Sequence, residues 1–242
     1  MPTYNRAWCI KIAIQGILDQ TFKDFEFLII DDGSEDLTDK IIANYKDERI
    51  KYVSLDKHYG LVHALSVGNE MAQGEIIVKQ DSDDISFPNR LEVIDREIKD
   101  NDFFYHSIYR VWQEEGDVDV VRRDFIEAKP ITDEILKVDY IPGAFAYTKK
   151  FIAETPYRDL ICSEDWMLIL DAYLKKKKIG FSTEALYDLC LRPDSNSVIH
   201  EQNKDYLKDK EKMEEILRSE YGINNFKYGF RNKNIVGDAN VQ

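Results

Sequence analysis

The fold is indicated most clearly by residues 74–84, which read Gly74-Glu75-Ile76-Ile77-Val78-Lys79-Gln80-Asp81-Ser82-Asp83-Asp84. The apolar core of this stretch, Ile76-Ile77-Val78, is typical of a short strand buried on both faces. The strand ends abruptly in a polar turn that carries three aspartates. The stretch therefore predicts a strand over residues 75–79 of an α/β protein, with an acidic turn at its carboxyl end.

Strands and helices alternate in the residues before this stretch. Apolar positions at helical spacing predict a helix within 7–19, and a short apolar run predicts a strand over 25–30. Ser34 is the expected N-cap of a second helix, and a strand over 50–55 and a helix over 61–72 follow. This order predicts an α/β, Rossmann-like fold, with a mainly parallel central sheet flanked by helices.

A second acidic turn, Asp31-Asp32, follows the strand predicted over 25–30. In parallel α/β sheets the carboxyl ends of the strands lie at one edge, and ligands bind beyond that edge. We therefore expect Asp31-Asp32 and Asp81–Asp84 to lie at the same edge of the sheet.

The second half of the chain is more mixed. Residues 103–112 and 118–121 flank a turn and predict a hairpin, and Ile141-Pro142-Gly143 reads as a loop. Helices are expected over about 164–175 and 202–219, with a polar tail after Gly222. We divide the chain into a ligand-binding half (1–100), a mixed second half (101–200) and a C-terminal helix with its tail (201–242).

The composition excludes several classes of protein. The net charge is −13, which opposes binding to the phosphates of nucleic acid. The three cysteines show neither a disulfide framework nor zinc-ligand spacing, and the histidines show no ligand spacing. No apolar run is long enough to span a membrane, and the start lacks the apolar core of a signal peptide. We expect a cytoplasmic protein; peripheral attachment to a membrane and a homo-oligomer are left open.

Asp81 and Asp83 are candidate ligands of a divalent cation. Two carboxylates one residue apart on a turn can converge on Mg²⁺ or Mn²⁺, which prefer oxygen ligands and leave positions for substrate phosphates. The alternative is a solvated acidic turn that caps the following helix.

The other two acidic pairs also have two explanations. Asp31-Asp32 is either part of a binding site or ordinary turn chemistry. Glu164-Asp165 stands where a helix is expected to begin, and acidic residues there stabilise the helix dipole. A carboxylate in that position, facing a pocket, is also well placed to act as a general base.

Taken together, these segments resemble the inverting glycosyltransferase family 2, which has the GT-A fold. The resemblance rests on five segments in order, spread over residues 2–200: Pro2-Thr3-Tyr4-Asn5-Arg6, residues 20–34, residues 72–77, Asp81-Ser82-Asp83-Asp84 with Pro88 and Arg90-Leu91, and Ser163-Glu164-Asp165-Trp166.

The resemblance implies roles for individual residues. Asp165, with Glu164 beside it, supplies the catalytic base, and Asp81 and Asp83 hold the metal. Gly143 and Trp166 lie on the acceptor side. The nucleotide is bound by Pro2, Thr3, Tyr4, Asn5, Asp31, Asp32, Asp81 and Ser82.

The sequence departs from the family at three places. Leu65 and Ser66 stand where the family has Arg and Asn, and Asp194 stands where it has a late His. The family also has a buried strand before its Pro-Thr-Tyr-Asn segment, whereas this chain begins at Met1-Pro2 with no strand expected. We expect residues upstream of Met1, or another segment or subunit, to fill that position.

The resemblance predicts a metal-assisted, inverting transfer of a sugar from a nucleotide-sugar, with UDP as the expected nucleotide, to a hydroxyl of a saccharide or lipid-linked saccharide. Two alternatives are kept. One is a degenerate sugar-nucleotide-binding protein without catalysis, which Leu65, Asp194 and the missing first strand favour. The other is a phosphatase-like hydrolase with an aspartyl-phosphate intermediate, which leaves the acidic pairs at 31–32 and 164–165 without a role.

Overall fold

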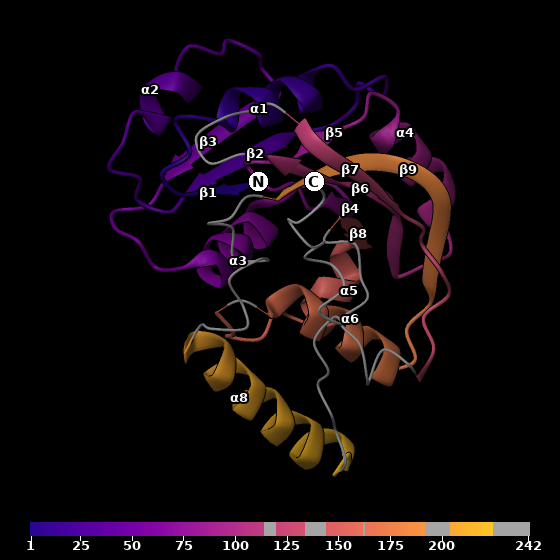
Figure 1. Cartoon of the computed structure of the whole chain (residues 1–242). Coiled ribbons are helices and arrows are strands. Elements are labelled where there is room, and N and C mark those ends of the chain that lie inside the picture. Colours follow the sequence, from indigo (N-terminus) through magenta and orange to yellow (C-terminus); the bar gives the residue numbers. More distant parts are fainter. Residues whose placement is uncertain (114–119, 134–143, 162, 192–203, 225–242) are drawn as a thin grey trace, which may run out of the picture.

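The first sheet consists of three parallel strands. The computed structural model describes residues 1–113, 120–133, 144–161, 163–191 and 204–224 (Figure 1). The strands lie in the order β1 (Pro2–Thr3), β2 (Phe27–Asp31) and β3 (Ile50–Ser54). β1 pairs with β2 through Pro2–Ile30 and Thr3–Asp31. The expectation that Met1-Pro2 begins without a strand is therefore wrong, because these residues form a short ladder with β2.

Three helices accompany this sheet: α1 (Ile10–Leu18), α2 (Thr38–Ile42) and α3 (Leu61–Met71). Ile10, Ile14 and Ile17 of α1 are buried against β2 and α2, as the helical spacing predicts. Ser34 is not the N-cap of α2, because its hydroxyl accepts a hydrogen bond from the backbone of Asn5 and the helix begins four residues later.

The second sheet is mixed, and strands from both halves of the chain build it. Its order is β4-β8-β6-β9-β5, with β7 paired to β6. The bounds are β4 (Ile76–Val78), β5 (Ile85–Ser86), β6 (Phe103–Gln113), β7 (Val120–Ile126), β8 (Phe145–Thr148) and β9 (Ile179–Leu191). The predicted hairpin is the antiparallel pair β6–β7.

The strand predicted over residues 75–79 is present as β4, but its partner differs from the expected one. It pairs antiparallel with β8 and has no ladder to β1–β3 among the described strands. β9 is a strand that the sequence pattern did not predict, because many of its side chains are only half-buried. Since β4 and β5 belong to residues 1–100 and pair with strands beyond 140, the two halves share one sheet.

Of the remaining four helices that the structure describes, three accompany the second sheet and the last packs outside them. They are α4 (Arg90–Ile98), α5 (Lys149–Glu154), α6 (Glu164–Leu174) and α8 (Lys204–Tyr221). Figure 1 shows α5 and α6 between the second sheet and α8. Met213 and Leu217 of α8 are wholly buried in the core cluster that contains most of α6. Among the described residues, no helix is long and apolar enough to cross a membrane.

Candidate active site

The acidic turn after β4 contains two aspartates that reach solvent and one that does not. The side chains of Asp81 and Asp83 are 24% and 19% exposed. Asp84 is buried, and its carboxylate accepts a hydrogen bond from the backbone of Cys190 at 2.7 Å. Burial and the charges of Asp83 and Asp81 raise the pKa of Asp84 well above its usual value. Asp84 therefore fastens the turn to β9, whereas the carboxylates of Asp81 and Asp83 lie beside Lys79 and Arg6.

Arg90 stabilises this turn from the protein interior. Its side chain is wholly buried and donates to the backbone oxygen of Lys79 at 2.9 Å and to side-chain oxygens of Gln80 and Ser86 at 3.1 and 2.8 Å. These bonds join the beginning and the end of the turn. The sequence resemblance includes Arg90 but does not predict this role.

Lys79 links the acidic turn to the beginning of α6. Its side chain is 3% exposed, and its Nζ lies 2.9 Å from Oδ2 of Asp81 and 2.6 Å from Oδ2 of Asp165. Burial lowers the pKa of Lys79, but the carboxylates of Asp165, Asp81 and Glu164 outweigh it and hold the pKa well above its usual value. The only sequence signal for this residue was a lysine at the end of a buried strand, beside carboxylates.

Glu164 and Asp165 share the first turn of α6 but have different surroundings. Glu164 is 6% exposed, and burial, followed by the charge of Asp165, raises its pKa to about 8. The Asp165 side chain is 22% exposed and contacts Lys79. At neutral pH Glu164 therefore holds a proton for most of the time. Asp165 instead lies against the ammonium of Lys79, which also contacts Asp81 of the acidic turn.

The second acidic turn holds a loop in place. Asp32 is 2% exposed and accepts hydrogen bonds from the backbone nitrogens of Tyr59 and Gly60 at 2.9 and 2.7 Å. Nδ1 of His58 lies 2.7 Å from the same carboxylate, and the His58 ring stacks on Tyr4 with a centroid separation of 3.9 Å. Asp32 and Tyr4 are thus brought together through His58, which the sequence pattern did not single out.

Several predicted nucleotide-binding residues have local structural partners. Asp31 accepts from the backbone of Ser34 and from the hydroxyl of Tyr52. Asn5 adopts a positive φ of 51°, and its side chain accepts from the backbone of Glu35. Pro2 and Thr3 are buried in β1. Among the described residues, the buried Thr3 hydroxyl has no hydrogen-bond partner.

The segment after β1 lies between the two acidic turns. The backbone of Asp32 donates to Thr3, and Nε of Arg6 lies 3.6 Å from Asp83. The thiol of Cys9 contacts the backbone oxygen of Ser82, which is itself buried. The turns after β2 and β4 are therefore close in space, although their strands lie in different sheets.

Other sequence-predicted positions fall away from this group or outside the described residues. Trp166 is 4% exposed and belongs to the hydrophobic core around α6. Leu65 is buried in the same core, and the Ser66 hydroxyl donates to the backbone of Val62 within α3. Leu65 therefore contributes an apolar side chain to the core, and the Ser66 hydroxyl is engaged within its own helix. Gly143 and Asp194 lie outside the described residues.

Asp81 and Asp83 fit a cation that also binds substrate phosphates. Among the described residues, no group of three or more His, Cys, Asp or Glu side chains is arranged to hold a metal. Mg²⁺ is usually held by one or two carboxylates, with phosphate oxygens and water completing its shell. Two partly exposed aspartates on one turn are ligands of the kind and number that such a cation uses.

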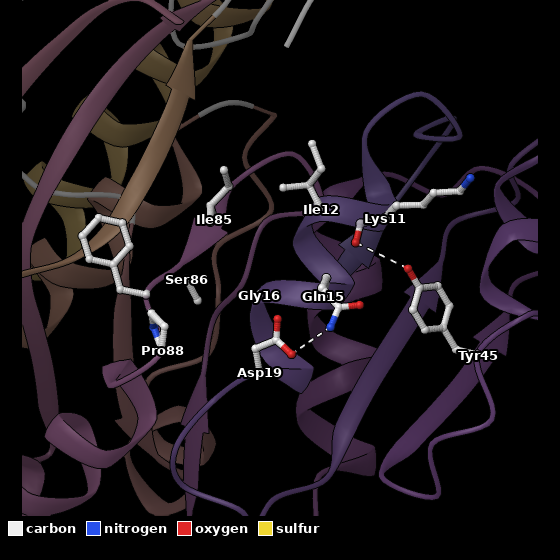
Figure 2. Close-up of a pocket in the computed structure, with 10 residues that line it drawn as sticks. Lys11, Ile12, Gln15, Gly16, Asp19, Tyr45, Ile85, Ser86 and Pro88 are labelled. Atoms are coloured by element: carbon white, nitrogen blue, oxygen red, sulfur yellow. Dashed lines mark hydrogen bonds between the residues drawn. The ribbon is translucent and has the colours of Figure 1, made fainter. Parts of the chain in front are cut away.

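A hollow on the outer side of α1 is separate from these groups. It has a volume of about 560 Å³. Figure 2 shows it between α1, Tyr45 and residues 85–88. None of the residues that line the hollow belongs to the predicted site, so the hollow is not part of the candidate active site.

Solved structures identify the class of fold. The S. aureus TarS fragment 1–349, solved with UDP-GlcNAc, is similar with a TM-score of 0.70 at 19% identity over 90% of this chain and 65% of that chain. The Pyrobaculum calidifontis mannosyltransferase PcManGT, solved with GDP-Man and Mn²⁺, gives 0.60 at 16% identity over 82% and 58%. The protein has the GT-A fold of glycosyltransferases, as the sequence predicted.

The family follows from the sequence itself. Residues 1–155, more than half of the chain, match Glycosyl transferase family 2. The chain therefore belongs to this family, and the resemblance inferred from its motifs is confirmed. A phosphatase-like hydrolase is no longer supported.

Among curated relatives, an uncharacterized glycosyltransferase of Rickettsia bellii is 39% identical over 48% of this chain and 17% of its own length. The Escherichia coli UDP-Glc:alpha-D-GlcNAc-diphosphoundecaprenol beta-1,3-glucosyltransferase WfgD is 34% identical over 46% and 44%. The aligned segment thus spans less than half of each of these two relatives.

Proposed function

We propose that this protein is an inverting, metal-assisted glycosyltransferase that moves a sugar from a nucleotide-sugar, in the first instance a UDP-sugar, to an acceptor hydroxyl. The observation that carries this proposal is the convergence of Asp81 and Asp165 on Lys79, at 2.9 and 2.6 Å. It supports a candidate base beside the turn that carries the donor-side carboxylates.

The reaction proposed is a single displacement. Asp165 accepts the proton of the acceptor hydroxyl while that oxygen forms a bond to the anomeric carbon. The bond between the anomeric carbon and the diphosphate breaks, and the configuration of the sugar inverts. A divalent cation held by Asp81 and Asp83 would stabilise the negative charge on the leaving diphosphate. Glu164 supports Asp165 from within the protein but is too buried to be the principal base.

The donor is assigned from both the site and its relatives. We propose that the nucleoside binds beside Thr3, Tyr4 and Asp32. In support, the backbone of Asp32 donates to Thr3, and His58 contacts both Asp32 and the aromatic ring of Tyr4. TarS was solved with UDP-GlcNAc and WfgD is named for UDP-Glc. These relatives support UDP, whereas PcManGT, solved with GDP-Man, represents the alternative nucleotide.

The acceptor is proposed to be a saccharide or a lipid-linked saccharide. WfgD is named for a diphosphoundecaprenol-linked GlcNAc, which supports the lipid-linked class. Such an acceptor would bring the protein to the cytoplasmic face of a membrane as a peripheral protein.

A thermal-shift screen tests the donor assignment. UDP, GDP, CDP and ADP, each with Mn²⁺, with Mg²⁺ or with a chelator, are compared for stabilisation of the fold, because a ligand that binds only the native state raises its stability. We expect UDP with a divalent cation to give the largest shift. Assays of sugar transfer and donor hydrolysis with the matching nucleotide-sugars then test the activity.

A protein that binds nucleotide-sugar without catalysis is the second candidate. Leu65 favours it, since this buried leucine replaces a family arginine and contributes only to the core. Tight nucleotide binding without donor hydrolysis or transfer, across a broad acceptor panel, would support this candidate over the first.

A further inference from the structure

We propose that Lys79 is a positioning residue of this site: its ammonium holds Asp165 against the acidic turn, and the base acts in the geometry that this contact sets. The inference rests on the proposed function. It adds a residue to which the motifs of the sequence assign no role.

The backbone of Lys79 is fixed on both sides. Its nitrogen donates to the backbone oxygen of Phe145 on β8 at 3.1 Å, and its own oxygen accepts from Arg90 at 2.9 Å. The side chain passes the Phe145 ring, with Nζ 5.6 Å from the ring centroid, and is almost fully buried. These contacts of the backbone and the side chain therefore fix the position of the ammonium.

The two carboxylates that Lys79 contacts come from distant parts of the chain. Asp81 belongs to the turn after β4, and Asp165 to the first turn of α6, 86 residues away from Lys79. With the ammonium between them, their mutual repulsion is replaced by two charge-assisted hydrogen bonds. Without it, Asp81 and Asp165 would repel each other in a partly buried site, and Asp165 would turn away from the acidic turn.

The Lys79 ion pairs differ from a purely structural ion pair in the residues that they join. Arg158 provides such a pair elsewhere, between buried Asp171 of α6 and Glu220 of α8. Lys79 instead joins Asp81, a proposed ligand of the donor's cation, to Asp165, the proposed base for the acceptor hydroxyl. Since misplacing a catalytic group by 1 Å can cost on the order of 10²-fold in rate, the location of this ammonium bears directly on turnover.

Two substitutions of Lys79 separate the effect of its charge from the effect of its geometry. A lysine ammonium is a compact charge, whereas an arginine guanidinium is a planar fork that contacts carboxylates at other distances and angles. Lys79→Met keeps an unbranched side chain as far as the ε position and removes the ammonium with its charge. Lys79→Arg keeps the charge and changes its geometry, so it should recover part of what Lys79→Met loses and retain the fold.

The deciding experiment measures kcat, donor KM and melting temperature for Lys79→Met, Lys79→Arg, Asp165→Asn and the two double variants. We expect Lys79→Met to lower kcat on the order of 10²-fold, Lys79→Arg to lower it less, and donor KM to change little. In the Asp165→Asn background neither change should lower kcat further, because Lys79 acts through Asp165. Lys177→Met is the control, since Lys177 pairs with Glu154 far from this site.

Two results would overturn the role of Lys79 while leaving the proposed transfer intact. In one, the decreases in kcat of the single variants add in the double variants; in the other, kcat falls only in proportion to the melting temperature. If Lys79→Met does not fold, Lys79→Arg with and without Asp165→Asn decides the question on the same criterion. A parent protein that neither transfers nor hydrolyses any nucleotide-sugar would instead overturn the proposed function, and the positioning role with it.

Discussion

Arg90 donates a hydrogen bond from Nε to Nε2 of His106 over 3.0 Å, and both side chains are wholly buried. The bond needs Nε2 as an acceptor, which assigns the imidazole proton to Nδ1, 2.9 Å from the backbone oxygen of Ser107. His106 thus holds the arginine that braces the acidic turn. Burial, followed by the charge of Arg90, lowers the pKa of His106 to about 3.

His106 should make the protein sensitive to acid. Its pKa is depressed in the folded state, so its contribution to stability is present above pH 6.5 and is lost as the pH falls towards 3. The slope is up to about 1.4 kcal/mol per pH unit. His106→Gln keeps a hydrogen-bond acceptor without a titrating group, and we expect a flatter dependence of the free energy of unfolding on pH in this window. Urea unfolding at several pH values measures it.

The matched control for this prediction is His63→Gln, because His63 is exposed on α3. It should keep the parental pH dependence. Parallel curves for the parent and His106→Gln between pH 6.5 and 3 would contradict the prediction.

Glu164 should produce a trend of the opposite sign. Burial raises its pKa to about 8 from 4.5, so its contribution to stability is complete below pH 4.5 and is lost as the pH rises through 8. Glu164→Gln removes the titration, and its stability should fall less than that of the parent between these values. Exposed Glu35 provides the control variant Glu35→Gln. A turnover loss in Glu164→Gln as large as that in Asp165→Asn would move the base role to Glu164.

Asp165→Asn should abolish most of the transfer activity. The amide keeps the shape of the side chain but cannot accept the proton, so transfer should fall by a factor on the order of 10²–10⁴ while nucleotide affinity stays close to parental. Kinetics and nucleotide titration on one preparation measure both quantities.

The capping alternative for Asp165 predicts a different result. Asparagine is a good residue at helix N-termini, so turnover per folded molecule would then be largely preserved. A lower melting temperature does not distinguish the two, because Asp165→Asn also breaks the ion pair with Lys79. Turnover normalised to the folded fraction decides between them.

Asp83→Ala should remove the dependence of nucleotide binding on a divalent cation. Its carboxylate lies on the exposed side of the turn, and its basic neighbour Arg6 is 3.6 Å away, so the loss should leave the fold intact. Calorimetric titration of UDP with and without Mn²⁺ measures the change. Asp188→Ala, on β9, is the control, since Asp188 pairs with Arg123 outside the site. Equal metal-dependent affinity in Asp83→Ala and the parent would refute the metal assignment.

The sequence by itself determined the class of fold, the elements around each acidic turn and the family. Apolar runs and helical spacing predict β2, β3, β4, α1 and α6 from local sequence alone. In β2, α1 and α6 these patterns reflect burial of the element's own side chains. The acidic turns were likewise visible as local groups of residues, at the ends of strands where ligands of α/β proteins bind.

Only the tertiary structure decided which of these groups meet, and in what environment. The partner of β4 is β8, more than 60 residues away, and a strand's own periodicity carries no information about its neighbour. Glu164 and Asp165 are adjacent in sequence, yet one is buried and the other contacts Lys79. Their charge states and the bridge to Asp81 depend on packing between distant segments, because desolvation and Coulomb interactions follow distance in space rather than distance along the chain.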